Sequence, residues 1–199
     1  MCLTQRVKSP ADLVRRGIRL EYLTLGWNVV GVVVVTLAAI SARSVALAGF
    51  GLDTLIEIGA SIVVVWELRS VSVERRHRAM RLIGTAFIIL VVYLVVLTIF
   101  SLVHEYHARH SPIGIVWSAL TALTMGVLAG AKHRTGTSLG NSVLLSESRV
   151  TLIDALLALA VVTGLCLNTG LGWWWADPAS GIVIIYYALR EARHAFSHD

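Results

Sequence analysis

Six long apolar runs, each bounded by charged or turn residues, constrain the fold of this 199-residue chain more than any other feature. A helix needs ~20 mostly apolar residues to cross a hydrocarbon core of about 30 Å, and the runs are near that length. We therefore predict an all-α, polytopic membrane protein with six transmembrane helices. The predicted spans are residues 22–40, 44–66, 82–103, 113–131, 143–167 and 173–189.

The composition excludes the main soluble classes. Only 15% of the residues are charged and the mean hydropathy is +0.76, whereas a soluble domain carries roughly a quarter charged residues. The net charge of +5 therefore indicates topology, and we expect no nucleic-acid partner. The two cysteines, Cys2 and Cys166, are too few for a disulfide framework or a thiolate metal site.

The distribution of basic residues predicts the orientation. Fourteen of the 17 Lys and Arg residues lie before span one, between spans two and three, after span four or after span six. These segments share one side of the membrane, and the positive-inside rule makes that side cytoplasmic. We expect a plasma-membrane protein with a cytoplasmic segment at residues 1–21, a six-helix domain at residues 22–190 and a short cytoplasmic tail at residues 191–199.

Three acidic residues, Asp53, Glu57 and Asp154, fall well inside predicted spans. Ionisable groups are costly in lipid and mark functional sites by default. Asp53 and Glu57 are four residues apart, on one helix face. Asp53 should lie about 13 Å from the outer surface and Asp154 about 16 Å from the cytoplasmic surface, so both approach the midplane. The pattern predicts a metal or proton site between two helices.

A short internal sequence match includes two of these acidic positions, Glu57 and Asp154. Thr-Leu-Ile-Glu at residues 54–57 is matched by Thr-Leu-Ile-Asp at residues 151–154, three spans later and in the opposite orientation. Inverted repeats with a site at their interface are a common plan in transporters. This sequence match favours a 3+3 inverted repeat.

The segment from Ser44 to Glu57 resembles the second helix of the cation diffusion facilitator family, where His or Asp is followed four residues later by Asp. Residues 144–154 resemble the fifth helix of that family, and Asp177-Pro178 resembles the opening of its sixth. The resemblance implies a secondary transporter rather than an enzyme. Such a transporter exports divalent cations, usually zinc, in exchange for protons, and is usually dimeric.

The chain departs from that family in two ways. Val150 stands where the family usually has a His ligand, which leaves the fourth ligand open. The family's cytoplasmic C-terminal domain is missing, so we expect a truncated branch in which a homodimer is an open question. Gly126 and Gly130 form a small-xxx-small pair that could pack helices within or between protomers.

Several further residues have two interpretations. Asn28 and Thr151 could supply neutral oxygen ligands or join helices by hydrogen bonds. Glu147, two turns before Asp154, could guide ions from the cytoplasm or could pair with Arg149 or lipid headgroups. The outer-loop histidines, His104, His107 and His110, could form a loose metal site, although a solvated loop is the favoured interpretation.

The chemistry of the site predicts ion exchange without a tightly bound cofactor. Clustered carboxylates in a low dielectric cannot all stay charged, so the empty site should hold protons, which an arriving cation displaces. An oxygen-rich site favours hard ions, but the resemblance favours zinc; we expect zinc first, with manganese, iron or cobalt as alternatives. Two functional alternatives are an intramembrane aspartyl protease, built on an Asp dyad, and a noncatalytic membrane scaffold.

Overall fold

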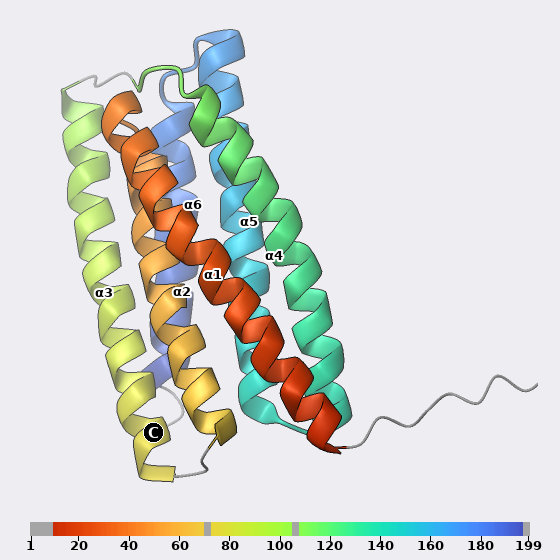
Figure 1. Cartoon of the computed structure of the whole chain (residues 1–199). Coiled ribbons are helices and arrows are strands. Elements are labelled where there is room, and N and C mark those ends of the chain that lie inside the picture. The colour runs from red at the N-terminus through yellow and green to blue at the C-terminus, as the bar shows by residue number, and fades with distance from the viewer. Residues whose placement is uncertain (1–9, 70–72, 105–107, 197–199) are drawn as a thin grey trace, which may run out of the picture.

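Six helices form one bundle in the computed structural model of the chain, which describes residues 10–69, 73–104 and 108–196 (Figure 1). Within these ranges the secondary structure is helical, with no strand, as the sequence predicts. The helices are α1 (Pro10–Ala42), α2 (Val45–Arg69), α3 (Val73–Val103), α4 (Pro112–Leu139), α5 (Ser142–Leu171) and α6 (Ala176–Phe196).

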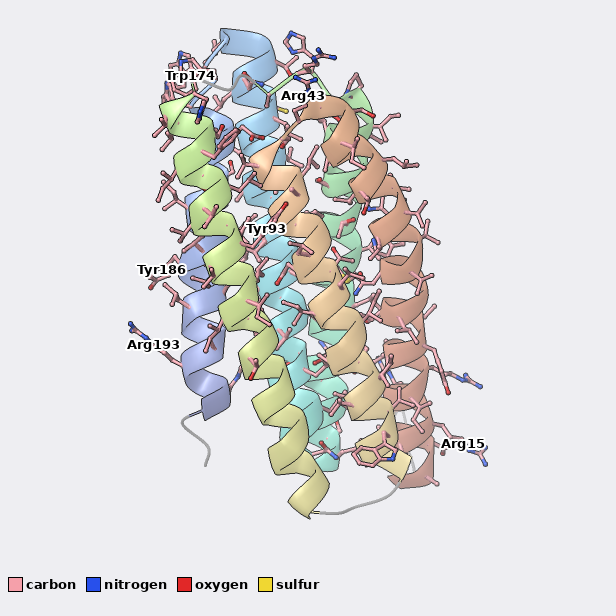
Figure 2. The ribbon with its side chains drawn as sticks, turned by 90° about the vertical axis from the view of Figure 1, so that its left-hand side faces the viewer. Arg15, Arg43, Tyr93, Trp174, Tyr186 and Arg193 are labelled. Carbon is pink, nitrogen blue, oxygen red and sulfur yellow. The ribbon has the colours of Figure 1, made fainter. Side chains whose placement is uncertain are left out.

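The helices alternate in direction, so that α1 begins and α6 ends at the same end of the bundle (Figure 1). Arg15 and Arg193 project toward this end, which we call the Arg15 end, and Arg43 and Trp174 mark the other, the Arg43 end (Figure 2). The α1–α2 turn lies at the Arg43 end, where Arg43 adopts a left-handed backbone conformation with φ of 53°. The backbone N–H of Arg109 donates to the Ala42 carbonyl and ties the start of α4 to this turn.

The chain is a membrane protein by the length and composition of its helices. Four of them, α1, α2, α4 and α5, are long and apolar enough to cross a membrane, and α3 contributes a shorter apolar stretch at residues 87–103. Large apolar side chains such as Leu23, Val96 and Leu123 point outward, while many polar side chains point inward. A soluble bundle has the opposite arrangement, so this outer surface is suited to lipid.

Local sequence signals fix the ends of α4 and α5. Ser111 caps α4, since its hydroxyl oxygen accepts from the Gly114 N–H, and Pro112 follows at a position where its missing N–H is harmless. Asn141 caps α5 in the same way through the Leu144 N–H. Gly140, with φ of 62°, ends α4 in a left-handed conformation that favours glycine. The tight α4–α5 turn therefore makes these helices antiparallel neighbours.

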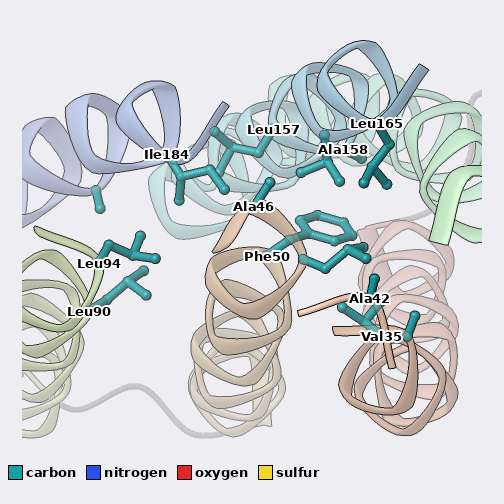
Figure 3. Close-up of a cluster of buried hydrophobic side chains, with 14 of the residues drawn as sticks. Val35, Ala42, Ala46, Phe50, Leu90, Leu94, Leu157, Ala158, Leu165 and Ile184 are labelled. Carbon is teal, nitrogen blue, oxygen red and sulfur yellow. The ribbon is translucent and has the colours of Figure 1, made fainter. Parts of the chain in front are cut away.

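Buried side chains of α1, α2, α3, α5 and α6 form the main apolar core, and partly buried α4 side chains such as Trp117 pack against it (Figure 3). Phe50 of α2 lies among Val35 of α1, Leu157 of α5 and other core residues, and Ile184 of α6 and Leu94 of α3 continue the cluster. A second, smaller apolar cluster of Leu20, Met125, Leu128 and Ala155 joins α1, α4 and α5, and buried polar residues share the space between these helices and α2. That space contains the predicted site.

Two boundaries differ from the prediction. Residues 12–21, expected in the cytoplasmic segment before the first span, belong to the continuous helix α1, and Glu21 is fully buried. The fourth helix runs to Leu139 rather than ending at residue 131, and its Lys132 is also fully buried rather than a cytoplasmic surface charge. The two corrections have one cause, because Lys132 and Glu21 form an ion pair inside the bundle at 3.0 Å.

The small-xxx-small pair has no packing role within the described part of the chain. A Cβ atom added at Gly126 or Gly130 would meet no atom within 4 Å. The face of α4 that carries them is therefore open to lipid or to another protein.

Candidate functional site

Buried polar side chains line much of the interior of the α1, α2, α4 and α5 quartet, beside the smaller apolar cluster. Its buried polar residues follow the inner face of each helix at spacings of three or four, as on one side of an α-helix. The ionisable ones are Glu21 on α1, Asp53 and Glu57 on α2, Lys132 on α4, and Glu147 and Asp154 on α5. Five carboxyl groups therefore share this region with one ammonium group.

Glu57 lies at the centre of α2 and is only 2% exposed. The Asn28 side chain of α1 donates from Nδ2 to Glu57 Oε2 at 3.0 Å. No donor among the described residues reaches Glu57 Oε1 or Asn28 Oδ1. Asn28 therefore joins helices, and its own oxygen stays free to act as a neutral ligand.

Asp154 of α5 is 2% exposed, and neither carboxyl oxygen has a donor within the described part of the chain. The charges of Glu57 and Asp53 both act on it, and the Glu57 carboxyl is within hydrogen-bonding reach. Two ionised carboxylates only accept hydrogen bonds. The pair needs a shared proton or a bound cation to compensate its charge.

Asp53, one turn from Glu57 on α2, is 7% exposed and belongs to the same electrostatic group. In this conformation, however, no three His, Cys, Asp or Glu side chains of the described residues are grouped closely enough to hold a metal ion. The structure thus brings Glu57 and Asp154 together, with Asn28 beside them. It does not close Asp53, Glu57 and Asp154 around one point.

A second cluster centres on Lys132, toward the Arg15 end. The Lys132 ammonium donates to Glu21 Oε2 at 3.0 Å, to Glu147 Oε1 at 3.3 Å and to Thr151 Oγ1 at 3.0 Å. The Ser61 hydroxyl of α2 donates to the same Glu147 oxygen at 3.4 Å. Lys132 therefore links α1, α4 and α5 by bonds that the sequence analysis did not predict.

The Lys132 cluster shows which partners Glu147 and Thr151 have, for each of which the sequence left two interpretations open. Glu147 is buried and pairs with Lys132, whereas Arg149 is exposed. Thr151 accepts from Lys132 and also lies within hydrogen-bonding reach of Glu57. The two carboxylate groups are therefore connected through α5, and Lys132 acts electrostatically on both Glu57 and Asp154. The signal for Lys132 was the need for a positive charge near so many buried acids.

Asp177, at the first turn of α6, serves a different purpose at the Arg43 end. Its carboxylate accepts from the Ser44 hydroxyl, from the Val45 N–H at 2.8 Å and from the Ala46 N–H at 3.4 Å. These N–H groups start α2 and have no partner inside that helix. Asp177 thus caps α2 and fixes α6 against it, so its satisfied carboxylate is structural.

The outer histidines do not form a group in the part of the chain that is described. His104 stacks on Phe100 with ring centroids 4.2 Å apart, and His110 is exposed. His107 lies outside the described residues.

A large cavity of about 550 Å³ lies elsewhere, between α1, α2 and α3. Its lining is almost entirely apolar and includes Ile40, Leu55 and Ile89. It contains none of the six buried ionisable residues described above, so it contributes no ion ligand.

Taken together, the described interior of the quartet is rich in carboxyl groups and holds buried acceptors without donors. One ammonium faces five carboxyl groups, and four acceptor oxygens around Glu57, Asp154 and Asn28 have no donor in the described chain. Buried acceptors without donors are costly, and oxygen-only ligands suit a cation. Comparison of the chain with protein-family models and with curated proteins gives no match.

Proposed function

We propose that this protein is a secondary transporter that moves a divalent metal cation across the membrane in exchange for protons. One observation supports it most: two carboxyl groups from oppositely running helices, Glu57 and Asp154, lie together without donors in the interior of a membrane bundle. A scaffold would be expected to satisfy such groups, as Asp177 is satisfied by its three donors.

The ligands we propose are Glu57, Asp154 and the Asn28 oxygen, with Asp53 joining in another conformation. Asp53 and Glu57 are one turn apart on the same face of α2, so a shift of that helix along its axis would change which of them is level with Asp154. Zinc is the first choice because of the resemblance to the cation diffusion facilitator family. Manganese, iron and cobalt fit an oxygen-rich site as well.

The exchange follows from competition for the same oxygens. A pair of carboxyl groups in a low dielectric binds a proton, and a metal ligates only the ionised form. Each cation that enters therefore releases protons. If the two halves of the bundle expose the site alternately to each side, the competition becomes antiport.

The direction follows from the basic residues. We propose that the Arg15 end faces the cytoplasm, as the positive-inside rule predicts, and that the cation leaves at the Arg43 end. The protease alternative needs two aspartates as direct partners. Both Glu57 and Asp53 act on Asp154, but only the Glu57 carboxyl is within hydrogen-bonding reach of it, and this pairing favours transport.

Proteoliposomes test the proposal. Vesicles that contain the wild-type chain and a trapped pH indicator should show proton flux when zinc is added on one side. Glu57→Gln and Asp154→Asn should abolish that flux, while the outward-facing change Leu123→Ala should preserve it. Normal zinc-dependent flux in either site variant would refute the proposed site.

A further inference from the structure

A single cation site at Glu57 and Asp154 does not explain the cluster around Lys132. Its ammonium is 0% exposed and uses all three of its donors on oxygens of Glu21, Glu147 and Thr151. A lysine buried so completely needs a compensating environment, and this one supplies two carboxylates for one positive charge.

The oxygens around the ammonium form a site in their own right. They come from α1 and α5 and converge on one point, at 3.0–3.3 Å from Nζ. The second Glu21 oxygen, Oε1, is buried, and no donor within the described ranges reaches it. A divalent cation carries one positive charge more than the ammonium. It would use this free oxygen and would neutralise both carboxylates.

The position of the cluster relates it to the proposed ion site. Glu147 precedes Asp154 by two helical turns, or about 10 Å, on the side of the Arg15 end. Thr151 lies between Glu147 and Asp154 along α5 and accepts from the Lys132 ammonium at 3.0 Å. A cation that travels along the inner face of α5 from the Arg15 end meets Glu147 first.

We propose that Glu21, Glu147 and Thr151 form a second divalent-cation site, which the tethered ammonium of Lys132 occupies in the conformation described here. An arriving cation displaces the ammonium from Glu147 and then passes to Glu57 and Asp154. This second step rests on the proposed function, whereas the site itself does not. Lys132 thereby acts as an internal competitor that keeps the carboxylates neutralised between ions.

The test removes the ammonium and leaves its pocket. Methionine ends one atom short of the lysine Nζ position, so Lys132→Met frees the oxygens without opening the apolar packing. The variant is made in a Glu57→Gln/Asp154→Asn background, so that the central site cannot contribute. Mn²⁺ alone is the probe, and electron paramagnetic resonance counts the ions bound by the purified, detergent-solubilised full-length chain.

The background protein with Lys132 intact should bind Mn²⁺ only weakly, because the ion must displace the ammonium, and Lys132→Met should add one tightly bound ion per chain. Adding Glu21→Gln should remove that ion again. A folded Lys132→Met protein that binds no Mn²⁺, or that binds it equally well with Glu21→Gln, would overturn the proposal. Failure of the proposed function shows separately, as absence of zinc-dependent proton flux in proteoliposomes that contain the wild-type chain.

Folding provides a second readout. Lys132→Met leaves two buried carboxylates unpaired, so the variant should need Mn²⁺ to reach the wild-type melting temperature. The charge-free variant Lys132→Met/Glu21→Gln/Glu147→Gln should fold without the ion and should not respond to it. If Lys132→Met stays unfolded in Mn²⁺, the inference is wrong, because a cation in the pocket would replace the lost charge.

Discussion

Replacing Asp154 with asparagine should stabilise the metal-free protein, although it removes a proposed ligand. Neither oxygen of Asp154 has a donor among the described residues, and the negative charge of Glu57 acts on it directly. The asparagine amide is nearly isosteric with the carboxylate and can donate to Glu57. The substitution therefore exchanges a repulsive contact for a hydrogen bond.

The magnitude follows from the type of bond gained. A hydrogen bond to a charged group contributes about 1.5–3 kcal/mol in soluble proteins, and bonds between membrane helices contribute about 0.6–1.7 kcal/mol. We expect a gain of about 1–2 kcal/mol in the free energy of unfolding. For a chain of this length that corresponds to a rise in melting temperature of roughly 2–8 °C.

Asp177→Asn is the matched control, because it makes the same chemical change at an equally buried aspartate. The Asp177 carboxylate accepts three hydrogen bonds at the start of α2, two of them from backbone N–H groups at 2.8 and 3.4 Å. The loss of its charge weakens these bonds and the interaction with the helix dipole. This variant should lose about 1–2 kcal/mol, since an amide can replace only part of the cap.

Thermal unfolding of the detergent-solubilised, metal-free protein, followed by circular dichroism, measures both changes. The advantage of Asp154→Asn should be greatest at alkaline pH and should shrink as the pH falls. A proton on the Glu57–Asp154 pair supplies the donor that asparagine supplies permanently. If Asp154→Asn destabilises the protein as much as Asp177→Asn at alkaline pH, the assignment of an unsatisfied carboxyl pair is wrong.

Two further substitutions probe the ligand set and the packing. Asn28→Asp should tighten Mn²⁺ binding and lower the melting temperature of the metal-free chain, because it places a third carboxylate beside Glu57; unchanged affinity in a titration would remove Asn28 from the site. Gly164→Ala should destabilise the bundle by about 1–3 kcal/mol, since its Cβ would lie 2.9 Å from the Ala176 carbonyl oxygen, whereas Gly170→Ala on the same helix meets no atom within 4 Å and should be neutral or slightly stabilising. Equal melting temperatures for the two alanine variants would contradict the close α5–α6 contact.

The helices themselves could be predicted from the sequence, because length and apolarity are local properties. Six runs of the right length give six helices in the structure. The polar face of α2 was also visible, since Asp53 and Glu57 share one side of any helix. The depths expected for Asp53 and Asp154 put both near the midplane, and in the structure their helices α2 and α5 are packed neighbours.

The partners of Lys132 and Glu21 could not be predicted in the same way. Both lie at the edges of apolar runs, where the positive-inside rule assigns a basic residue such as Lys132 to the cytoplasmic side. Their burial depends on how α1, α4 and α5 rotate and on how far each helix extends past its apolar run. These are properties of the packed bundle rather than of any one segment.

The sequence could not predict either which of Asp53 and Glu57 pairs with Asp154. The spacing of Asp53 and Glu57 suggested that both could share one ion with Asp154, but helix rotation decides which one faces α5 directly. In the structure Glu57 does so and Asn28 supplies its donor. Helix α1, which carries neither of the two matching segments, therefore contributes Asn28 to the candidate site.

The most direct test of cation–proton exchange is to count the protons released when zinc binds. Purified wild-type protein in weakly buffered detergent solution is titrated with Zn²⁺, while a pH indicator records proton release and calorimetry records binding. Binding at the Glu57–Asp154 pair should release protons in step with zinc uptake, and Glu57→Gln/Asp154→Asn should lose both signals together. Zinc uptake by the wild-type chain without proton release, or undiminished release by the double variant, would contradict exchange at these two carboxyl groups.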